Sequence, residues 1–459
     1  MRIQLLRQAR APCWRFVNVT AGAFQAEFSD AVYVATGAVH GSPIVHMVLD
    51  LQRSFCHRAL RDAVAHGIDK FPVLGCRYET RFFRDRWVPD SSPVDSVIHC
   101  EESGEDSRQV WLEHWVNQPI DPTCTRPLRV VQRKSSTGAT LLISVAHAAS
   151  DGAGIIAFVH ELACSLCGAP SRAETSPERG IRQLVRALSG RQLAALPAGV
   201  VQEGLRPLKL ARLADRRRPA ATSGSRASRV KTIVLEGPAY EAFRRSCTAV
   251  GATINDGLAA VMAQLGTTQS DAAVPIYYTA NLRRVMDAPK AIAGNLSGGE
   301  VMLLAPDALG SLSEAARAAA SVTSVTKSGA PGLGLVVFQW LTVGWLPHAL
   351  LRNLAVPQLA ASSLSLFRKS LVLTNCGALD RYLEPFGSDL LAASVMGPFA
   401  DAFPVPVVVT TGLRSSLTLQ ICVGSGFPEQ ELEQFAEQLT QLLHAPSSEP
   451  VATSQPSAA

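Results

Sequence analysis

The sequence predicts an α/β protein built of two lobes with a site between them. Runs rich in strand-forming residues alternate with stretches whose apolar residues recur at helical spacing, and this alternation occurs both before and after a basic, proline-rich segment at residues 170–228. The chain has 459 residues, of which 47% are hydrophobic and 18% are charged. This composition is typical of a packed protein, and the length suffices for two cores with a cleft between them.

The first half of the chain contains the clearest strand and helix patterns. Apolar residues at helical spacing predict a helix that Pro72 ends, because proline has no backbone N–H to donate. The run at 139–145 is apolar on both faces, which predicts a central strand leading directly into His147. The expected elements are strand 45–51, helix 55–71, extended residues 73–74, a hairpin of strands 128–131 and 139–145, and helix 154–166.

The second half follows the basic segment, which we expect to contain helices and then a surface crossover. Thr253 or Asn255 is expected to cap a helix. The expected elements are strand 229–235, helices 238–249 and 254–265, strands 273–279 and 371–374, a strand pair at 405–411 and 417–423, and helix 428–443. The predicted domains are an N-terminal lobe at 1–215, a basic linker at 216–228, a C-terminal lobe at 229–444 and a disordered tail at 445–459.

Cysteine usage and charge restrict the compartment and the partners. The ten cysteines lack the spacing of a disulfide scaffold, and residues 1–24 lack a secretory signal, so a cytoplasmic protein is expected. An organellar presequence is the alternative, because no acidic residue precedes Glu27. The net charge is +5, and no nucleic-acid-binding motif is present. We therefore expect a monomer without a nucleic-acid partner.

One apolar stretch, residues 333–351, has nearly the length of a membrane-spanning helix. Gln339, Gly344 and Pro347 interrupt it, so a buried or interfacial helix is favoured, with peripheral membrane contact at most. Trp340 and Trp345 within it are interpreted as core residues.

His147 is the strongest candidate for chemistry. It ends an apolar strand, at the edge of a sheet where α/β proteins place reactive groups. Histidine, with an ordinary pKa of roughly 6.5, can take up and return a proton near neutral pH. Asp151 follows four residues later, and Gly152 allows a close backbone approach. A buried core histidine beside a helix-capping aspartate explains the spacing equally well.

The surrounding sequence resembles the superfamily of condensation domains and alcohol acyltransferases, whose mark is HxxxDG. The resemblance is carried by PLRV at 127–130, LLISVAHAASDGAGI at 141–155, LRDAV at 60–64, FPVLGCR at 71–77, TIND at 253–256, NLR at 281–283 and TNCG at 374–377. It implies two chloramphenicol acetyltransferase-like lobes with mixed sheets and a central inter-lobe tunnel.

Two departures from the family patterns favour the standalone bacterial acyltransferase branch. Condensation domains usually carry two adjacent histidines, and Ala146 takes the place of the first. The DFGWG segment of plant acyltransferases is absent.

The resemblance implies transfer of an acyl group from a thioester to a hydroxyl or amino acceptor, without an acyl-enzyme. His147 would be the general base, and Asp151 would hold the loop through an ion pair with Arg283. Backbone near Gly152, or Thr374 and Asn375, would bind the oxyanion.

The resemblance also implies a co-substrate in place of a bound cofactor, namely acyl-CoA or the phosphopantetheine thioester of an acyl-carrier protein. The acceptor would be a small-molecule or lipid alcohol or amine. Asn295 lies in a GN segment that the family places at the inter-lobe cleft, and we interpret it as substrate-binding or oxyanion-binding.

Three other groups of residues were considered as functional sites. His160, Cys164 and Cys167 share a helix face, but zinc needs four ligands and no second pair is visible, so core residues are favoured and no metal is expected. No G-x-S-x-G elbow of a serine hydrolase occurs. Arginines 216–218 fit either a carrier-protein docking patch or a solvated linker, and the linker is favoured.

Two functional alternatives to the standalone acyltransferase remain. One is a non-catalytic binding or scaffold protein with a condensation-like fold. The other is a lipid acyltransferase of the wax ester or diacylglycerol type.

Overall fold

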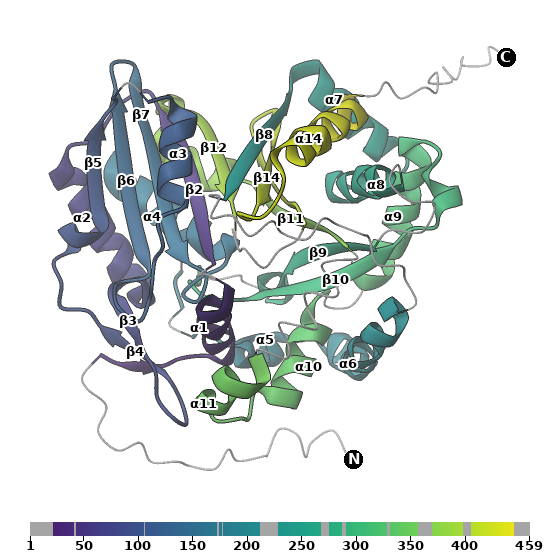
Figure 1. Ribbon diagram of the computed structural model, residues 1–459, viewed down its shortest axis with the longest axis horizontal. Helices are drawn as coiled ribbons and strands as arrows, with labels where there is room; N and C mark the ends of the chain where they lie inside the picture. Colours follow the sequence, from purple (N-terminus) through teal and green to yellow (C-terminus); the bar gives the residue numbers. More distant parts are fainter. Residues whose placement is uncertain are drawn as a thin grey trace.

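Two large mixed sheets lie side by side, and each is covered by helices, as expected for an α/β protein of two lobes (Figure 1). The computed structural model describes residues 22–40, 43–104, 106–171, 174–176, 178–211, 228–267, 275–286, 291–327, 331–356, 370–397 and 405–444. The arginines at 216–218 and the tail at 445–459 lie outside the described residues. The predicted linker and tail therefore stay predictions.

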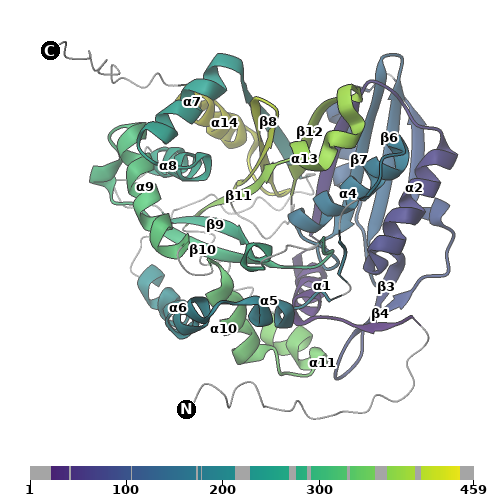
Figure 2. The same ribbon diagram turned by 180° about the vertical axis from the view of Figure 1, so that it is seen from behind.

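The first sheet has five strands in the order β12-β2-β7-β6-β5. Its strands are β12 Leu390–Met396, β2 Ile44–Leu51, β7 Gly138–Ala146, β6 Leu128–Ser135 and β5 Ile98–Glu102. The predicted hairpin is present as the antiparallel pair β6–β7, and β7 is central and buried along almost its whole length. Helices α2 His57–Lys70 and α4 Gly152–Cys167 pack against each other over one face of this sheet (Figure 2).

Strand β12 comes from the later part of the chain but pairs antiparallel with β2, placing Val395 opposite Met47. The first sheet is thus completed by a segment more than 300 residues further along the chain. One hydrophobic core accordingly contains side chains from both halves, such as Leu141 and Val407.

The second sheet has six strands in the order β10-β9-β11-β13-β14-β8. Its strands are β10 Ser297–Leu303, β9 Pro275–Asn281, β11 Leu371–Ala378, β13 Val407–Leu413, β14 Ser416–Val423 and β8 Arg229–Glu236. Strand β11 runs parallel to both β9 and β13, whereas the other pairs are antiparallel. A second core lies between this sheet and α7 Gly237–Ala249, α8 Ile254–Thr267, α9 Leu312–Lys327 and α14 Glu429–His444.

Most sequence-predicted elements are confirmed with small changes of boundary. Thr253 caps α8: its hydroxyl accepts a hydrogen bond from the backbone N–H of Asp256, whose carboxylate accepts from Thr253 N in return. Two α-helices of the basic segment, α5 Ile181–Ala187 and α6 Gly190–Ala211, are also present. The expected extended piece at 73–74 is wrong, because Pro72 opens a short 3₁₀ helix, Pro72–Gly75, that buries Val73 and Leu74.

A small third sheet extends the first lobe at its lower end in Figure 1. It has the order β1-β4-β3, from Phe24–Gln25, Arg86–Pro89 and Cys76–Glu79. Helix α1, Phe28–His40, follows β1 and lies between the two lobes (Figures 1 and 2).

The apolar stretch at 333–351 forms two helical pieces. Helix α10, Leu333–Val343, is followed by α11, His348–Leu350, which continues as a π-helical turn to Ala355, and the two axes are bent by 108°. Within the described residues, no single helix has both the length and the apolarity needed to cross a membrane, although this bent pair meets that test by length and composition. The interpretation of the tryptophans as core residues is wrong: Trp340 is 41% exposed and Trp345 is 67% exposed.

Candidate active site

His147 follows the last residue of β7, and five residues later α4 begins at Gly152. The strand end thus presents the imidazole between the two sheets, and only 9% of the residue is exposed. Its backbone N–H donates to the carbonyl of Pro43 at 2.8 Å, which ties the loop to the start of β2.

The side chain of Asn295 determines which imidazole nitrogen carries the proton. Its Nδ2 donates to the carbonyls of His147 at 2.8 Å and Ala148 at 3.3 Å, so its Oδ1 faces His147 Nδ1 at 3.0 Å. An amide oxygen only accepts hydrogen bonds, and therefore Nδ1 donates. Nε2 is left with its lone pair, which is the tautomer that a general base requires.

The environment of His147 also favours its neutral form. Burial lowers the pKa of the imidazole below its usual value, and this effect outweighs the opposing influence of Asp151 and the hydrogen bond to Asn295. Tyr33 of α1 stacks on the ring, with centroids 4.1 Å apart and planes inclined by 12°. The imidazole is therefore neutral at physiological pH and fixed in orientation.

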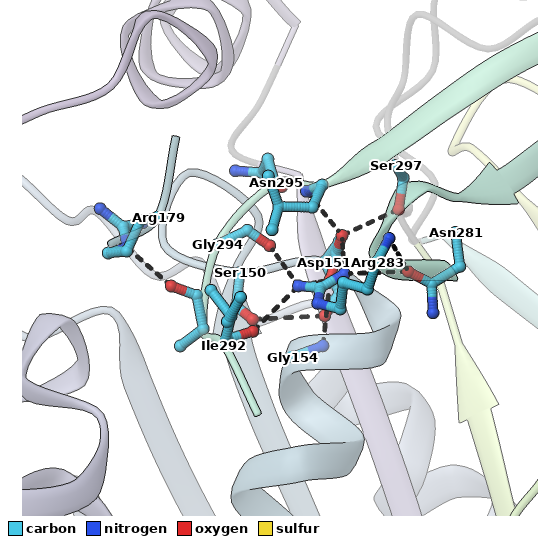
Figure 3. Close-up of polar contacts among 12 residues, drawn as sticks. Ser150, Asp151, Gly154, Arg179, Asn281, Arg283, Ile292, Gly294, Asn295 and Ser297 are labelled. Atoms are coloured by element: carbon cyan, nitrogen blue, oxygen red, sulfur yellow. Dashed lines mark hydrogen bonds and ion pairs between the residues drawn. The ribbon is translucent and has the colours of Figure 1, made fainter. Parts of the chain in front are cut away.

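Asp151 lies at the start of α4, where its Oδ1 accepts from the N–H of Gly154 at 3.0 Å as a helix cap (Figure 3). The two guanidinium nitrogens of Arg283 each donate to one carboxylate oxygen, both at 2.9 Å. The backbone of Leu296 and the hydroxyl of Ser297 also donate to Oδ2. The carboxylate is therefore fully engaged between the lobes.

Burial by itself would raise the pKa of Asp151, but the Arg283 guanidinium and the hydrogen bonds from Ser297 and Gly154 outweigh it and hold that pKa below its usual value. Arg283, only 6% exposed, further donates to the carbonyls of Ile292 and Gly294 (Figure 3). The ion pair thus fastens the loop after β7 to the segment before β10, which carries Asn295.

A second buried ion pair, Arg179 with Asp30, was not predicted from the sequence. Arg179 Nη1 lies 2.8 Å from the Asp30 carboxylate, and Arg179 also donates to the carbonyls of Ala149 and Ala293. These contacts fix the loop of His147, the loop of Asn295 and helix α1, which also carries Tyr33. Neither Tyr33 nor Arg179 lies in a recognisable motif, so no sequence signal could have found them.

The remaining predicted residues lie at the ends of the strands around this cluster. A side chain at Gly152 would place its Cβ 3.3 Å from Cys376 Sγ, so the end of β11 lies directly against the start of α4. Thr374 and Asn375 precede that cysteine on β11, and Asn375 Oδ1 accepts from Gly377 N at 2.8 Å. Their predicted contact with an oxyanion stays a prediction.

Two cavities border the cluster. One, of about 160 Å³, is lined by Asn295 and Leu296 and extends to Trp340. The other, of about 570 Å³, is lined by Asn281, Asn375 and Gly377. Leu282 lines both, whereas His147 lines neither, so the expected continuous tunnel stays a prediction.

The alternative zinc site gains no support. In the described part of the chain, no group of three or more His, Cys, Asp or Glu side chains is placed to hold a metal ion. His160 Nδ1 is bonded to the carbonyl of Tyr382, and Cys164 is buried in the same helix.

Known proteins were compared with the chain at three levels. No family model matches it, and no curated protein matches it in sequence. Solved structures do match over nearly the whole chain, and they show the two-lobed fold of condensation domains and chloramphenicol acetyltransferase-like acyltransferases.

Three of these structures illustrate the range of proteins that share the fold. The first condensation domain of the CDA synthetase has a TM-score of 0.64 at 15% identity, covering 93% of this chain and 97% of its own. The trichothecene 15-O-acetyltransferase TRI3 of Fusarium sporotrichioides has a TM-score of 0.66 at 11% identity, covering 94% and 97%. The epimerization domain of the third module of tyrocidine synthetase B has 0.63 at 11% identity, covering 92% and 96%. At these identities the comparison establishes the fold, and the chemistry must be argued from the site.

Proposed function

We propose that the protein is an acyltransferase that moves an acyl group from a thioester to a hydroxyl or amino acceptor, with His147 as the general base. The observation that carries this proposal is the contact of Asn295 Oδ1 with Nδ1 of His147, from which the tautomer follows. Asn295 holds the proton on Nδ1, so that Nε2 is free to accept one. The lowered pKa keeps that nitrogen unprotonated at neutral pH.

In the proposed reaction, Nε2 removes the proton of the acceptor while the acceptor oxygen or nitrogen attacks the thioester carbonyl. The imidazolium that forms is stabilised by the Nδ1–H bond to Asn295. The tetrahedral intermediate then expels the thiolate, which takes the proton back from Nε2. No bond to the protein forms, and therefore no acyl-enzyme is expected.

The negative oxygen of the intermediate needs hydrogen-bond donors aligned in advance. We assign this role to backbone N–H groups at the start of α4, near Gly152, where the helix dipole is positive. Thr374 and Asn375 at the end of β11 are the second candidates, because that strand end lies against Gly152.

Two structural neighbours support the donor class. TRI3 is named as an acetyltransferase, and the starter condensation domain of rhizomide synthetase was solved with C8-CoA, at a TM-score of 0.63 and 14% identity. By analogy we propose acyl-CoA or an acyl-carrier-protein thioester as the donor. The epimerization domain shows that the same fold serves other chemistry, so the reaction itself must be measured.

The test follows free thiol released from a panel of acyl-CoAs and acyl-phosphopantetheine thioesters, each with alcohol and amine acceptors. Active pairs should lose activity by about 10²–10⁴-fold in His147→Ala, the usual contribution of a general base. His57→Ala is the matched control, because His57 is half exposed and pairs with Asp95 away from the site. Retention of most activity in His147→Ala would refute the assignment. If none of the donors tested releases thiol in the presence of an acceptor, the result would favour a binding protein.

A further inference from the structure

Two segments distant in sequence form one surface at the lower end of the molecule in Figure 1, where the β3–β4 connection reaches α11. The backbone N–H groups of His348 and Ala349 donate to the carbonyls of Phe83 and Phe82, both at 3.0 Å. Arg84 donates to the carbonyl of Gly344 at 3.2 Å. The connection and the bent α10–α11 segment are thus held together by two backbone hydrogen bonds and one from the Arg84 side chain.

Large apolar side chains project from both segments into solvent. We call this set the aromatic tip: Phe82, Phe83, Trp340, Leu341, Trp345 and Leu354. Phe83 is 70% exposed and Trp345 is 67% exposed. Single exposed apolar residues are ordinary, but several gathered at one end of a molecule indicate a contact surface.

The tip is fixed in position although it is exposed. Phe82 and Phe83 pack edge to face, with ring centroids 4.9 Å apart. Behind them, the carboxylate of the fully buried Asp85 pairs with Arg352 and accepts from Tyr78 Oη at 2.7 Å. This buried anchor holds the β3–β4 connection in place beneath the exposed rings.

The indole nitrogen of Trp345 already has a hydrogen-bond partner within the protein. Its Nε1 donates to the carbonyl of Thr342 at 3.0 Å, inside the same segment. The indole can therefore move from water into an apolar environment without leaving its N–H donor unsatisfied. An unsatisfied N–H would otherwise oppose the burial of tryptophan.

The charge around the tip is predominantly positive. Among the described residues, the two cavities beside the tip are lined by Arg81, Arg84, Arg86 and Arg182 against one carboxylate, that of Glu27. Of these arginines, Arg81 is paired with Glu79. Exposed aromatics beside arginines match the interface of an anionic bilayer, where aromatic rings enter the headgroup region and arginines meet lipid phosphates.

The surface also borders a cavity that one residue of the candidate active site lines. The cavity of about 160 Å³ is lined by Trp340, Gly344 and Arg84 of the tip region and also by Asn295, the hydrogen-bond partner of His147. A membrane at the tip would therefore lie beside a cavity that Asn295 also lines.

We propose that the aromatic tip docks this protein peripherally on the surface of an anionic phospholipid membrane. The docking does not depend on the reaction proposed above. The bend of 108° between α10 and α11 lets the apolar residues lie in the interface without crossing it.

The experiment is co-sedimentation of the full chain with vesicles of phosphatidylcholine alone or with 30% phosphatidylglycerol. We expect binding to the anionic vesicles that weakens at high salt. The double variant Phe82→Ser/Phe83→Ser should lower the partition coefficient by about tenfold or more, since two buried phenyl rings are lost. The matched control is Val234→Ser/Leu391→Ser, because those residues are 48% and 52% exposed and lie on β8 and β12, outside the aromatic tip.

A second readout uses the protein's own tryptophans. Trp340 and Trp345 should shift their emission to shorter wavelength on anionic vesicles and be quenched by brominated lipids, and Trp345→Phe should reduce both signals. Absence of binding by the folded parent would overturn the proposal, as would equal binding of the Phe82/Phe83 variant and the parent. Concentration-dependent dimers that disappear in this variant, without vesicle binding, would assign the tip to a second copy of the chain instead. Equal binding to neutral vesicles would overturn the requirement for anionic lipid.

Discussion

Asn295 Oδ1 lies 3.0 Å from Nδ1 of His147, while Nδ2 of the same amide donates to the carbonyl of His147 itself. One side chain therefore fixes both the tautomer of the imidazole and the backbone that carries it. The sequence indicated Asn295 as a ligand of the substrate, but its amide is occupied by the loop of His147. We infer that it is a positioning residue.

Replacement of Asn295 by Asp should change the pH dependence of the proposed reaction. A carboxylate beside Nδ1 stabilises the imidazolium and raises the pKa of His147. The base is then protonated up to a higher pH, so the acidic limb of the kcat profile should move to higher pH, whereas Asn295→Ala should lower kcat at all pH values. Asn353→Asp, at an exposed position of the π-helical turn Leu351–Ala355, is the control and should leave the profile unchanged. An unshifted limb in Asn295→Asp would refute the positioning role.

Tyr33 should act through its ring and not through its hydroxyl. The parallel stack on His147 holds the imidazole plane, and burial raises the pKa of Tyr33 far above its usual value, so the phenol stays protonated. Tyr33→Phe should keep kcat within about twofold, whereas Tyr33→Ala should lower it by about tenfold through loss of orientation. The measurement is thioester turnover at saturating substrate. Equal losses in the two variants would show that the hydroxyl takes part.

The ion pair of Asp151 and Arg283 should show strong coupling. Asp151→Asn leaves the buried Arg283 charge uncompensated and should lower the free energy of unfolding by about 3–5 kcal/mol. Arg283→Met alone should cost a similar amount, but the double variant should recover part of the loss, because no unpaired charge remains. Urea unfolding of the parent, the two single variants and the double variant gives the coupling energy. Strictly additive losses of free energy would contradict the predicted coupling.

Acid stability should depend on His46, which is fully buried in β2 and bonded through Nδ1 to Ser144 Oγ at 2.9 Å. Burial, together with the charge of Arg129, lowers the pKa of His46 to about 3 in the folded protein. In the unfolded chain it titrates near its ordinary value of roughly 6.5, so the unfolded state binds the proton first as the pH falls. The contribution of neutral His46 to the free energy of unfolding is therefore fully present above about pH 6.5 and is lost progressively as the pH falls toward 3.

The measurement is the free energy of unfolding of the parent and His46→Gln across that pH range. The variant should be less stable at pH 7 but have a shallower decline on acidification, since glutamine does not titrate. Parallel declines would assign the acid sensitivity to other groups.

Much of the fold could be predicted because local pattern and tertiary structure agree along most of the chain. The run at 139–145 is apolar on both faces, and β7 is indeed central and buried. By contrast, neither β12 nor β10 was predicted, and β10, Ser297–Leu303, begins with Ser, Gly and Gly, of which glycine is a poor strand former. Gly299 is required there by packing: a Cβ would lie 1.8 Å from the hydroxyl oxygen of Tyr277 on the neighbouring strand.

The exposed tryptophans show the limit of reading hydrophobicity from sequence. An apolar stretch normally predicts burial, and Leu333 and Val337 of α10 are buried as expected. Trp345 lies in the turn between α10 and α11, at Gly344 and Pro347, and Trp340 lies at an exposed position of α10. Composition does not reveal such a turn or the face that it leaves in solvent.

The sequence by itself determined the α/β class, most strands and helices, and the loop from His147 to Asp151 between a central strand and a helix. These features follow from short-range periodicity and from residue types that a strand end and a helix cap require. Only the tertiary structure decided which groups meet at His147 and its loop. Tyr33, Arg179 and Asn295 come from three segments separated by more than 100 residues each, and no local pattern encodes their contact. The proton position on His147 depends on one of these long-range contacts, and therefore the chemistry of the site is a property of the fold.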